Sequence, residues 1–287
     1  MNVLVTGGSG RIGRYVVRDL VAAGHVVTNA DLAPTPGLPG GFLRVDLTDA
    51  GDVYQALAYT QSQAVIHLGA WANAGIVPDT RTYGDNVRGA YNVFQACADL
   101  GIQRIVNASS AQVYGFAKAA PLYAPVDEDH PLRPCNSYAL AKVVGEQTAD
   151  YFVQQFGLTI LSFRFMGVRM PGEIAGEIAA MAADPASGAW LLWTRTDARD
   201  AALACRLAIE AAEVPSGPYN ITGAQVVLDQ PAAELVATHF GASTKLHDLP
   251  DHTSPLSTAR AQAAFGYRPR YVWNQSQRHP ENEPETE

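Results

Sequence analysis

Three glycines near the start of the chain have the spacing of a phosphate-binding turn. Gly7, Gly10 and Gly13 follow the apolar run Val3 to Val5, and apolar residues then recur at helical spacing. In a strand–turn–helix unit, the first glycine permits the tight turn, the second lets the backbone approach a pyrophosphate, and the third allows close packing of helix on strand. Free amides and the dipole at the helix N-terminus favour phosphates there. The pattern predicts a dinucleotide site, with a purely structural turn as the alternative.

A carboxylate follows the glycines at the distance expected of a ribose ligand. Asp31 ends the second predicted strand, residues 26–30, where it would accept hydrogen bonds from the adenosine ribose hydroxyls. Its negative charge would repel a 2′-phosphate, so it favours NAD over NADP. The alternative is a solvated aspartate at the end of a strand.

Two residues after the third predicted strand, residues 42–45, are further candidates for cofactor contact. Asp46 and Leu47 lie between that strand and a predicted helix over residues 49–59. Asp46 would approach the adenine, or else cap the helix region.

Small residues follow the next predicted strand, residues 64–68. Gly69 and Ala70 would let a cofactor pass close to the backbone. Trp71 either walls a substrate pocket or packs at the base of its loop. On the helix that follows, Asn86 is the polar position of interest. The repeated strand–turn–helix units predict an α/β fold with a doubly wound parallel sheet.

A second set of reactive side chains comes from the middle of the chain. Ser109 and Ser110 follow another predicted strand, so they would lie at the carboxyl edge of the sheet, where ligands bind in this class of fold. A long helix is predicted from about Asn136. Tyr138 and Lys142 are spaced i and i+4 near its start, which places both on one helical face.

Composition limits the classes of protein. The chain has 287 residues, of which 47% are hydrophobic, enough for one large α/β core and a small lobe. A net charge of −8 disfavours nucleic acid as a partner. No apolar run is long enough to cross a bilayer, and no signal peptide precedes the first strand, so we expect no membrane partner and a cytoplasmic location.

The cysteines and histidines suggest no metal or disulfide chemistry. Cys97, Cys135 and Cys205 are few and widely spaced, which predicts neither a disulfide framework nor a zinc site. The histidines are scattered, and His67, inside a predicted strand, is expected to be a core residue. We therefore expect no metal site.

Several of these stretches together resemble one enzyme family. TGGSGRIG at residues 6–13, SSAQVYG at 109–115 and YALAK at 138–142 resemble the extended short-chain dehydrogenase/reductase superfamily, and within it the NAD-dependent epimerase/dehydratase branch. The resemblance implies a Rossmann fold, NAD as cofactor, and a homodimer formed through the helices that start near Tyr83 and Asn136. It extends over nearly the whole chain through four further stretches, at residues 128–134, 199–200, 219–221 and 265–269.

The resemblance also implies a division of the chain. Residues 1–165 would form the NAD-binding Rossmann domain. Residues 166–275 would form a small substrate lobe interleaved with the last core elements. Residues 276–287, which are rich in glutamate and proline, would be a disordered acidic tail.

By this resemblance, Tyr138 is the acid/base, Lys142 its helper and a nicotinamide-ribose ligand, and Ser110 the ligand of the substrate hydroxyl. A free tyrosine has a pKa of about 10, too high for a base at neutral pH. A neighbouring ammonium and the positive nicotinamide would favour the phenolate. The full set expected to contact the cofactor is Gly7, Gly10, Arg11, Ile12, Gly13, Asp31, Asp46, Leu47, Leu68, Gly69, Ala70, Asn86, Tyr138 and Lys142. The set expected to contact the substrate is Trp71, Ser110, Gln112 and Arg169.

The chain departs from the family's nucleotide-sugar enzymes after the predicted strand at residues 158–165. Gly167 stands where those enzymes usually carry an asparagine that contacts the substrate's phosphates, and Arg169 replaces an aromatic residue. The segment between Pro171 and Asp197 is also much shorter than in those enzymes. These differences resemble the compact uronate dehydrogenases. Arg169, with Arg164, would then offer a fork for a carboxylate. The alternatives are a structural Arg169 and an Arg164 that ties the strand end to nearby backbone.

Two tryptophans of the expected small lobe have an open role. Trp190 and Trp193 either wall the substrate pocket or belong to an aromatic core.

The expected function is NAD-dependent oxidation of a secondary alcohol on a small sugar or sugar-acid substrate. A nucleotide-sugar 4-epimerase, which recycles its bound cofactor, shares the first step and is the main alternative. A dehydratase is less favoured, because Ala111 and Gln112 stand where that class carries an acidic pair. A non-catalytic NAD-binding regulator is the alternative from another class, and the presence of Tyr138 and Lys142 argues against it.

Overall fold

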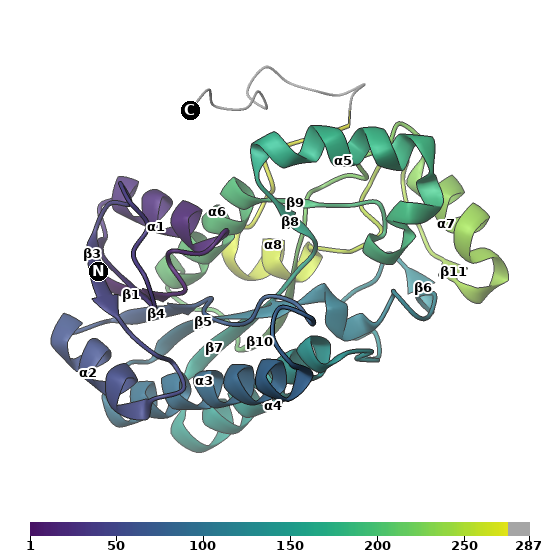
Figure 1. Cartoon of the computed structure of the whole chain (residues 1–287). Coiled ribbons are helices and arrows are strands. Elements are labelled where there is room, and N and C mark those ends of the chain that lie inside the picture. The colour runs from purple at the N-terminus through teal and green to yellow at the C-terminus, as the bar shows by residue number, and fades with distance from the viewer. Residues whose placement is uncertain (275–287) are drawn as a thin grey trace.

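Seven parallel strands form the centre of the computed structural model, which describes residues 1–274 (Figure 1). Their order across the sheet is β10-β7-β5-β4-β1-β2-β3. Every neighbouring pair runs parallel, which agrees with the doubly wound sheet predicted from the repeated strand–turn–helix units. The strands are β1 (Asn2–Thr6), β2 (Val26–Asp31), β3 (Gly41–Arg44), β4 (Ala64–His67), β5 (Arg104–Ser110), β7 (Thr159–Phe165) and β10 (Gly217–Ile221).

Helices cover both faces of this sheet, and the side-chain alternation of the strands shows why. In β1, Val3 and Val5 pack into the core under one set of helices, whereas Leu4 packs into the core under the other. A strand buried on both faces reads as a continuous apolar run, because successive side chains point to opposite faces. One face carries α1 (Gly13–Ala22), α6 (Ala198–Glu210) and α8 (Ala259–Phe265); the other carries α2 (Ala50–Thr60), α3 (Asp79–Asp99) and α4 (Ser137–Phe156) (Figure 1).

A smaller lobe lies beside the sheet and has its own apolar core. That core includes Ile174, Ile178 and Met181 of α5, Leu235 of α7, and the fully buried Trp193. In Figure 1, α5 lies on the side of the molecule away from α3 and α4. The lobe and its connections contain β6 (Tyr123–Ala124), β8 (Val168–Arg169), β9 (Thr196–Asp197), β11 (Lys245–Leu246), α5 (Pro171–Ala183), α7 (Ala232–Phe240), and the 3-10 segments η1 (Ala111–Tyr114), η2 (Pro185–Leu191) and η3 (Gly241–Ser243).

The stretch predicted as the substrate lobe, residues 166–275, contributes to both parts of the molecule. Its β10 completes the main sheet, and its α6 and α8 pack on one sheet face. The predicted acidic tail, residues 276–287, lies outside the described residues.

Two elements differ from the sequence prediction in their bounds. The helix predicted to begin near Tyr83 begins one turn earlier, at Asp79. The strand predicted to deliver Ser109 and Ser110 includes both of them, because β5 continues to Ser110 beside β7.

Two features are absent from residues 1–274: a helix that could cross a membrane and a cluster of side chains that could hold a metal ion. No helix of that part is long and apolar enough to cross a membrane. Nor does it contain a group of three or more histidine, cysteine, aspartate or glutamate side chains placed to hold a metal ion.

Candidate active site

The glycine turn has the geometry that its spacing predicts. Gly7 has φ +68°, and a Cβ there would lie 2.6 Å from the Gly69 nitrogen, so a side chain is excluded. A Cβ at Gly13 would lie 2.1 Å from the Gly7 carbonyl oxygen, so this glycine permits the close packing of α1 on β1. The Gly10 amide donates to the same oxygen at 3.0 Å and closes the turn. Gly10 itself is exposed.

The N-terminus of α1 is suited to a diphosphate. Its N-cap residue is Ile12, and no side chain among residues 1–274 caps it. Side chains cap α2, α4 and α6, whereas α3, α7 and α8, like α1, have no side-chain cap within the described residues. Uncapped amides at a helix N-terminus beside a bare glycine turn fit the phosphates of a dinucleotide such as NAD.

Asp31 lies at the carboxyl end of β2, beside the glycine turn. Its carboxylate accepts hydrogen bonds from the Ser9 amide at 3.0 Å and the Leu32 amide at 2.7 Å. Both bonds fix its orientation, and the half-exposed side chain keeps acceptor capacity for a ribose.

Asp46 and Leu47 lie at the next strand end. The Asp46 carboxylate accepts hydrogen bonds from the amide and hydroxyl of Thr48, at 2.9 and 2.8 Å, which lower its pKa. Asp49, not Asp46, caps α2. A Cβ at Gly69 would lie 2.4 Å from the Leu47 side chain, so Leu47 packs directly against the loop after β4.

The loop after β4 is held by an asparagine and a tryptophan that the sequence singled out. Gly69 donates its amide to Thr6 Oγ1 at 3.1 Å, and Leu68 and Ala70 flank it. The buried Asn86 amide accepts from the Trp71 backbone nitrogen at 2.8 Å and donates to the Trp71 oxygen at 3.0 Å. Asn86 therefore positions the loop.

The indole of Trp71 is itself fixed. Its Nε1 donates to Asp85 at 2.8 Å, and Arg81 lies over the ring, 5.2 Å from its centroid.

Ser110, Tyr138 and Lys142 meet at the carboxyl edge of the sheet. Ser110 ends β5, and the other two lie in the first two turns of α4, which begins after the N-cap Asn136. Lys142 Nζ lies 5.6 Å from the centroid of the Tyr138 ring and donates to the Ala108 carbonyl at 2.6 Å. A hydroxyl, a phenol and an ammonium in this arrangement can hold an alcohol oxygen and move its proton.

The pKa values of this group follow from burial. Burial raises the pKa of Tyr138 above its ordinary value, and the neighbouring Ser110 hydroxyl acts in the opposite direction. Burial lowers the pKa of Lys142 to about 8, against the effect of Glu146. His67, which lies in the core as the sequence predicts and contacts Thr6 Oγ1 through Nδ1 at 2.8 Å, has its pKa lowered to about 3 by burial and by Lys142.

A buried ion pair beneath these residues was not predicted from the sequence. Arg164 of β7 donates to both carboxylate oxygens of Glu146, at 3.0 and 2.7 Å. Its remaining contacts are the Tyr114 hydroxyl at 3.0 Å and the Glu128 carbonyl at 2.9 Å. Glu146 also accepts from Ser109. Arg164 thus contacts backbone near the strand end, which is one of the two roles that the sequence suggested for it. The sequence signal for its ion pair is Glu146, one helical turn after Lys142.

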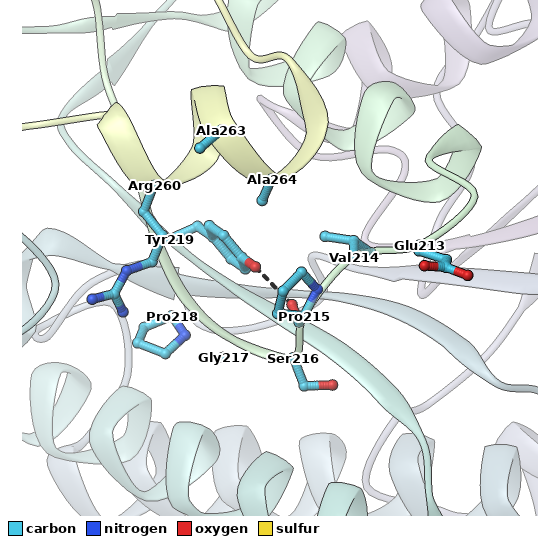
Figure 2. A pocket seen from close by; sticks show the side chains of 10 residues that line it. All are labelled: Glu213, Val214, Pro215, Ser216, Gly217, Pro218, Tyr219, Arg260, Ala263 and Ala264. Carbon is cyan, nitrogen blue, oxygen red and sulfur yellow. Dashed lines mark hydrogen bonds between the residues drawn. The ribbon is translucent and has the colours of Figure 1, made fainter.

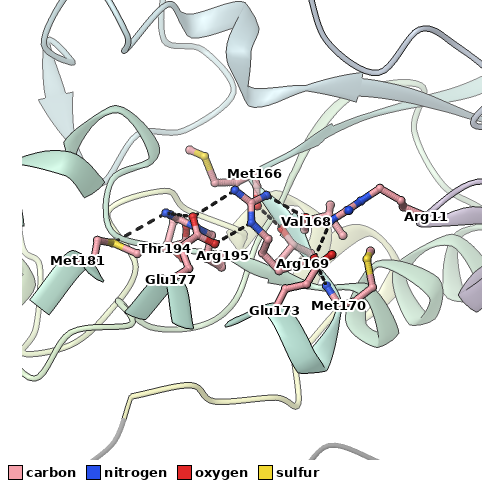
Figure 3. A network of polar contacts seen from close by, with 11 residues as sticks. Arg11, Met166, Val168, Arg169, Met170, Glu173, Glu177, Met181, Thr194 and Arg195 are labelled. Atoms are coloured by element: carbon pink, nitrogen blue, oxygen red, sulfur yellow. Dashed lines mark hydrogen bonds and ion pairs between the residues drawn. The ribbon is translucent and has the colours of Figure 1, made fainter. Parts of the chain in front are cut away.

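Arg169 takes part in a second network, within the lobe. Its guanidinium donates to both oxygens of Glu177 of α5, at 2.6 and 3.1 Å. Arg195 donates to Glu177 Oε1 at 2.7 Å, so two arginines share one carboxylate (Figure 3). Arg195 is buried, whereas Arg169 remains partly exposed. Gly167, at φ +48°, leaves room for Arg195, whose Cδ would lie 3.1 Å from a Cβ at that position.

The remaining substrate candidates lie around η1. Gln112 donates to Asn73 at 2.8 Å and accepts from Asn136 at 3.2 Å, linking the loop after β4 to the start of α4. Gln112 and Trp190, which is 41% exposed, line one small pocket. Trp193 instead belongs to the buried lobe core.

A larger hollow of about 860 Å³ lies elsewhere (Figure 2). Its lining runs from Glu213 to Tyr219, at the amino end of β10, and includes Arg260 and two alanines of α8. Ser110 lies at the carboxyl edge of the parallel sheet, so this hollow is not part of the candidate active site.

Known proteins resemble both the sequence and the fold. The model of the NAD-dependent epimerase/dehydratase family matches residues 3–222. A UDP-glucose 4-epimerase of Lactobacillus helveticus is 31% identical over 178 residues, which cover 58% of this chain and 52% of that protein. A uronate dehydrogenase of Pseudomonas syringae pv. tomato is 26% identical over 163 residues, or 56% of this chain and 58% of that protein. The chain thus spans little more than half the length of the curated relatives it matches.

A solved structure extends the likeness to almost the whole chain. It is a short-chain dehydrogenase/reductase superfamily protein from Agrobacterium tumefaciens with bound NAD. Its TM-score is 0.72 at 25% identity, covering 94% of this chain and 93% of that one.

Proposed function

Because the chain belongs to the NAD-dependent epimerase/dehydratase family, we propose that it oxidises a secondary alcohol of a sugar or sugar-acid substrate with NAD. The observation that carries this proposal is the meeting of Ser110, Tyr138 and Lys142 at the sheet edge that also holds the glycine turn. A non-catalytic regulator would have no need of these three side chains together.

Each of the three side chains has a distinct part in the reaction. Bound NAD supplies the acceptor for the hydride. Ser110 holds the substrate oxygen, so that the carbon to be oxidised has a fixed orientation. Tyr138, as phenolate, removes the hydroxyl proton. Lys142 lowers the energy of that phenolate through its charge and binds the nicotinamide ribose. Gln112 adjoins this site, because its backbone amide donates to Ser110 Oγ at 3.2 Å, and Trp71, in the loop after β4, is the second side chain proposed to contact the substrate.

The substrate is proposed to be small and to carry no nucleotide. Gly167 offers no side chain to a phosphate, and Arg195 fills the space beside it. Arg169 and Arg195 share Glu177, so these three side chains together carry one net positive charge. A single carboxylate of a sugar acid matches that excess, with Arg169 as the accessible member. A nucleotide-sugar 4-epimerase is the second candidate, favoured by the identity to the Lactobacillus helveticus enzyme.

The proposed active form is a cytoplasmic homodimer, with α3 and α4 at the interface. Large apolar side chains exposed on these helices support the dimer: Tyr83, Tyr91, Leu140, Tyr151 and Phe156.

The test is the absorbance of NADH at 340 nm with excess NAD and a panel of free uronic acids, aldoses and UDP- or dTDP-sugars. We expect sustained NADH formation with a free sugar or sugar acid, and its loss in Tyr138→Phe. Isomerisation of a nucleotide sugar without NADH release would establish the epimerase instead. Full turnover by Tyr138→Phe would exclude the role given to that phenol.

A further inference from the structure

An ion pair joins the glycine turn to the small lobe. Arg11, the residue after Gly10, donates from Nη2 to Glu173 Oε2 at 2.6 Å, although the two are 162 residues apart (Figure 3). Arg11 immediately precedes Ile12, the N-cap of α1, whose uncapped amides fit a diphosphate. Glu173 lies in the first turn of α5. The contact therefore connects the N-terminal end of α1, where a cofactor's phosphates would lie, to the first turn of α5.

The same glutamate also organises α5. Its Oε2 accepts a hydrogen bond from the amide of the N-cap residue, Met170, at 3.2 Å, and so caps the start of the helix. One turn later, Glu177 binds Arg169 and Arg195 of the lobe. Through α5, Arg11 is thus linked to the arginine cluster proposed to hold the substrate (Figure 3).

The pair is exposed enough to be exchanged. The Arg11 side chain is 59% exposed and that of Glu173 is 41% exposed, and pairs in such positions contribute little to stability. A diphosphate at the N-terminus of α1 would offer Arg11 more negative charge, together with bidentate acceptors.

We propose that Glu173 is a positioning residue that competes with the cofactor's diphosphate for Arg11. The ion pair of Glu173 with Arg11 joins α5 to the glycine turn. When the cofactor binds, Arg11 leaves the Glu173 carboxylate and pairs with the diphosphate. The N-terminal end of α5 then loses its contact with the glycine turn. This inference rests on the NAD site of the proposed function and on no particular substrate.

Calorimetric titration of the full chain with NAD tests the competition without any turnover. We expect Glu173→Gln to bind NAD roughly threefold more tightly at low salt, because glutamine keeps the helix cap but loses the charge that holds Arg11. Arg11→Gln should weaken NAD binding. In the Arg11→Gln background, Glu173→Gln should have no effect, since the competing contact is already gone.

The matched control is Glu234→Gln, at the equivalent first-turn position of α7 in the same lobe, which should leave the affinity unchanged. Weaker NAD binding by Glu173→Gln, or an equal gain with and without Arg11, would overturn the proposal. Because the readout is NAD affinity, failure to find an oxidisable alcohol would not affect it.

Amide hydrogen exchange then tests the release of α5. Adding NAD to the unaltered protein should speed exchange in the first turn of α5, whereas Arg11→Gln should exchange fast there with or without NAD. If NAD binding to the unaltered protein slowed amide hydrogen exchange in the first turn of α5, the proposal that Arg11 leaves Glu173 for the diphosphate would be wrong.

Discussion

At the residue scale, the proposed role of Tyr138 as a base depends on the charge of Lys142. Burial raises the pKa of Tyr138 and lowers that of Lys142 to about 8. Below about pH 8 Lys142 carries the charge that favours the phenolate in the proposed mechanism, and above that pH the charge is lost. We expect kcat/KM for the proposed oxidation to rise with pH as the Tyr138 phenolate forms, and to rise less steeply above about pH 8, where Lys142 loses the charge that favours the phenolate.

Removal of that charge should move the profile. In Lys142→Met, we expect kcat/KM at neutral pH to fall by about tenfold or more, and its acidic limb to move up by about one pH unit, because an opposite charge at this range shifts a pKa by roughly 1–3 units. Steady-state rates from pH 6 to 10 measure both. Lys245→Met, at an exposed lysine of β11, is the control. An unshifted limb in Lys142→Met would exclude the electrostatic role.

At the element scale, the buried pair of Arg164 and Glu146 joins β7 to α4 and so fixes the helix that carries Tyr138. Replacement of Glu146 by Gln leaves a buried guanidinium without its counter-charge, so we expect a loss of roughly 3–5 kcal/mol in the free energy of unfolding. Urea denaturation measures it. Asp129→Asn, which removes the 77% exposed partner of Arg260, should cost less than about 1 kcal/mol. Equal losses in the two variants would show that the buried pair has no special weight.

Local patterns were enough to predict the main strands and helices up to residue 165, but not the smaller elements that follow or the contacts between distant segments. The glycine turn could be predicted because steric limits within one short segment require glycine at positions 7 and 13. The pairing of Tyr138 with Lys142 was readable because i and i+4 share a helical face. No local rule predicts that Arg11 meets Glu173, 162 residues later. The same holds for Arg169 of β8, whose partner Glu177 lies on the following helix, α5.

At the scale of the whole molecule, an aromatic surface on α3 and α4 predicts self-association. Tyr91, Tyr151 and Phe156 are each more than 40% exposed, and all three rings contact the buried Phe152 in edge or stacked geometry. They therefore form one continuous patch, of the kind that soluble proteins usually cover. A homodimer through these helices would remove it from water on both copies at once, because a twofold interface uses the same patch twice.

Light scattering at micromolar concentration should give the mass of a dimer, and Tyr151→Glu should give a monomer, since the interface would then bury two unpaired carboxylates at its centre. Tyr59→Glu, at a tyrosine on α2 that is 77% exposed but outside the patch, should remain dimeric. A monomeric unaltered protein would refute the dimer.

The site should survive dissociation, because Ser110, Tyr138 and Lys142 come from one copy, so the Tyr151→Glu monomer should still bind NAD. Loss of NAD binding in a folded monomer would show that the interface holds α4 in its working position.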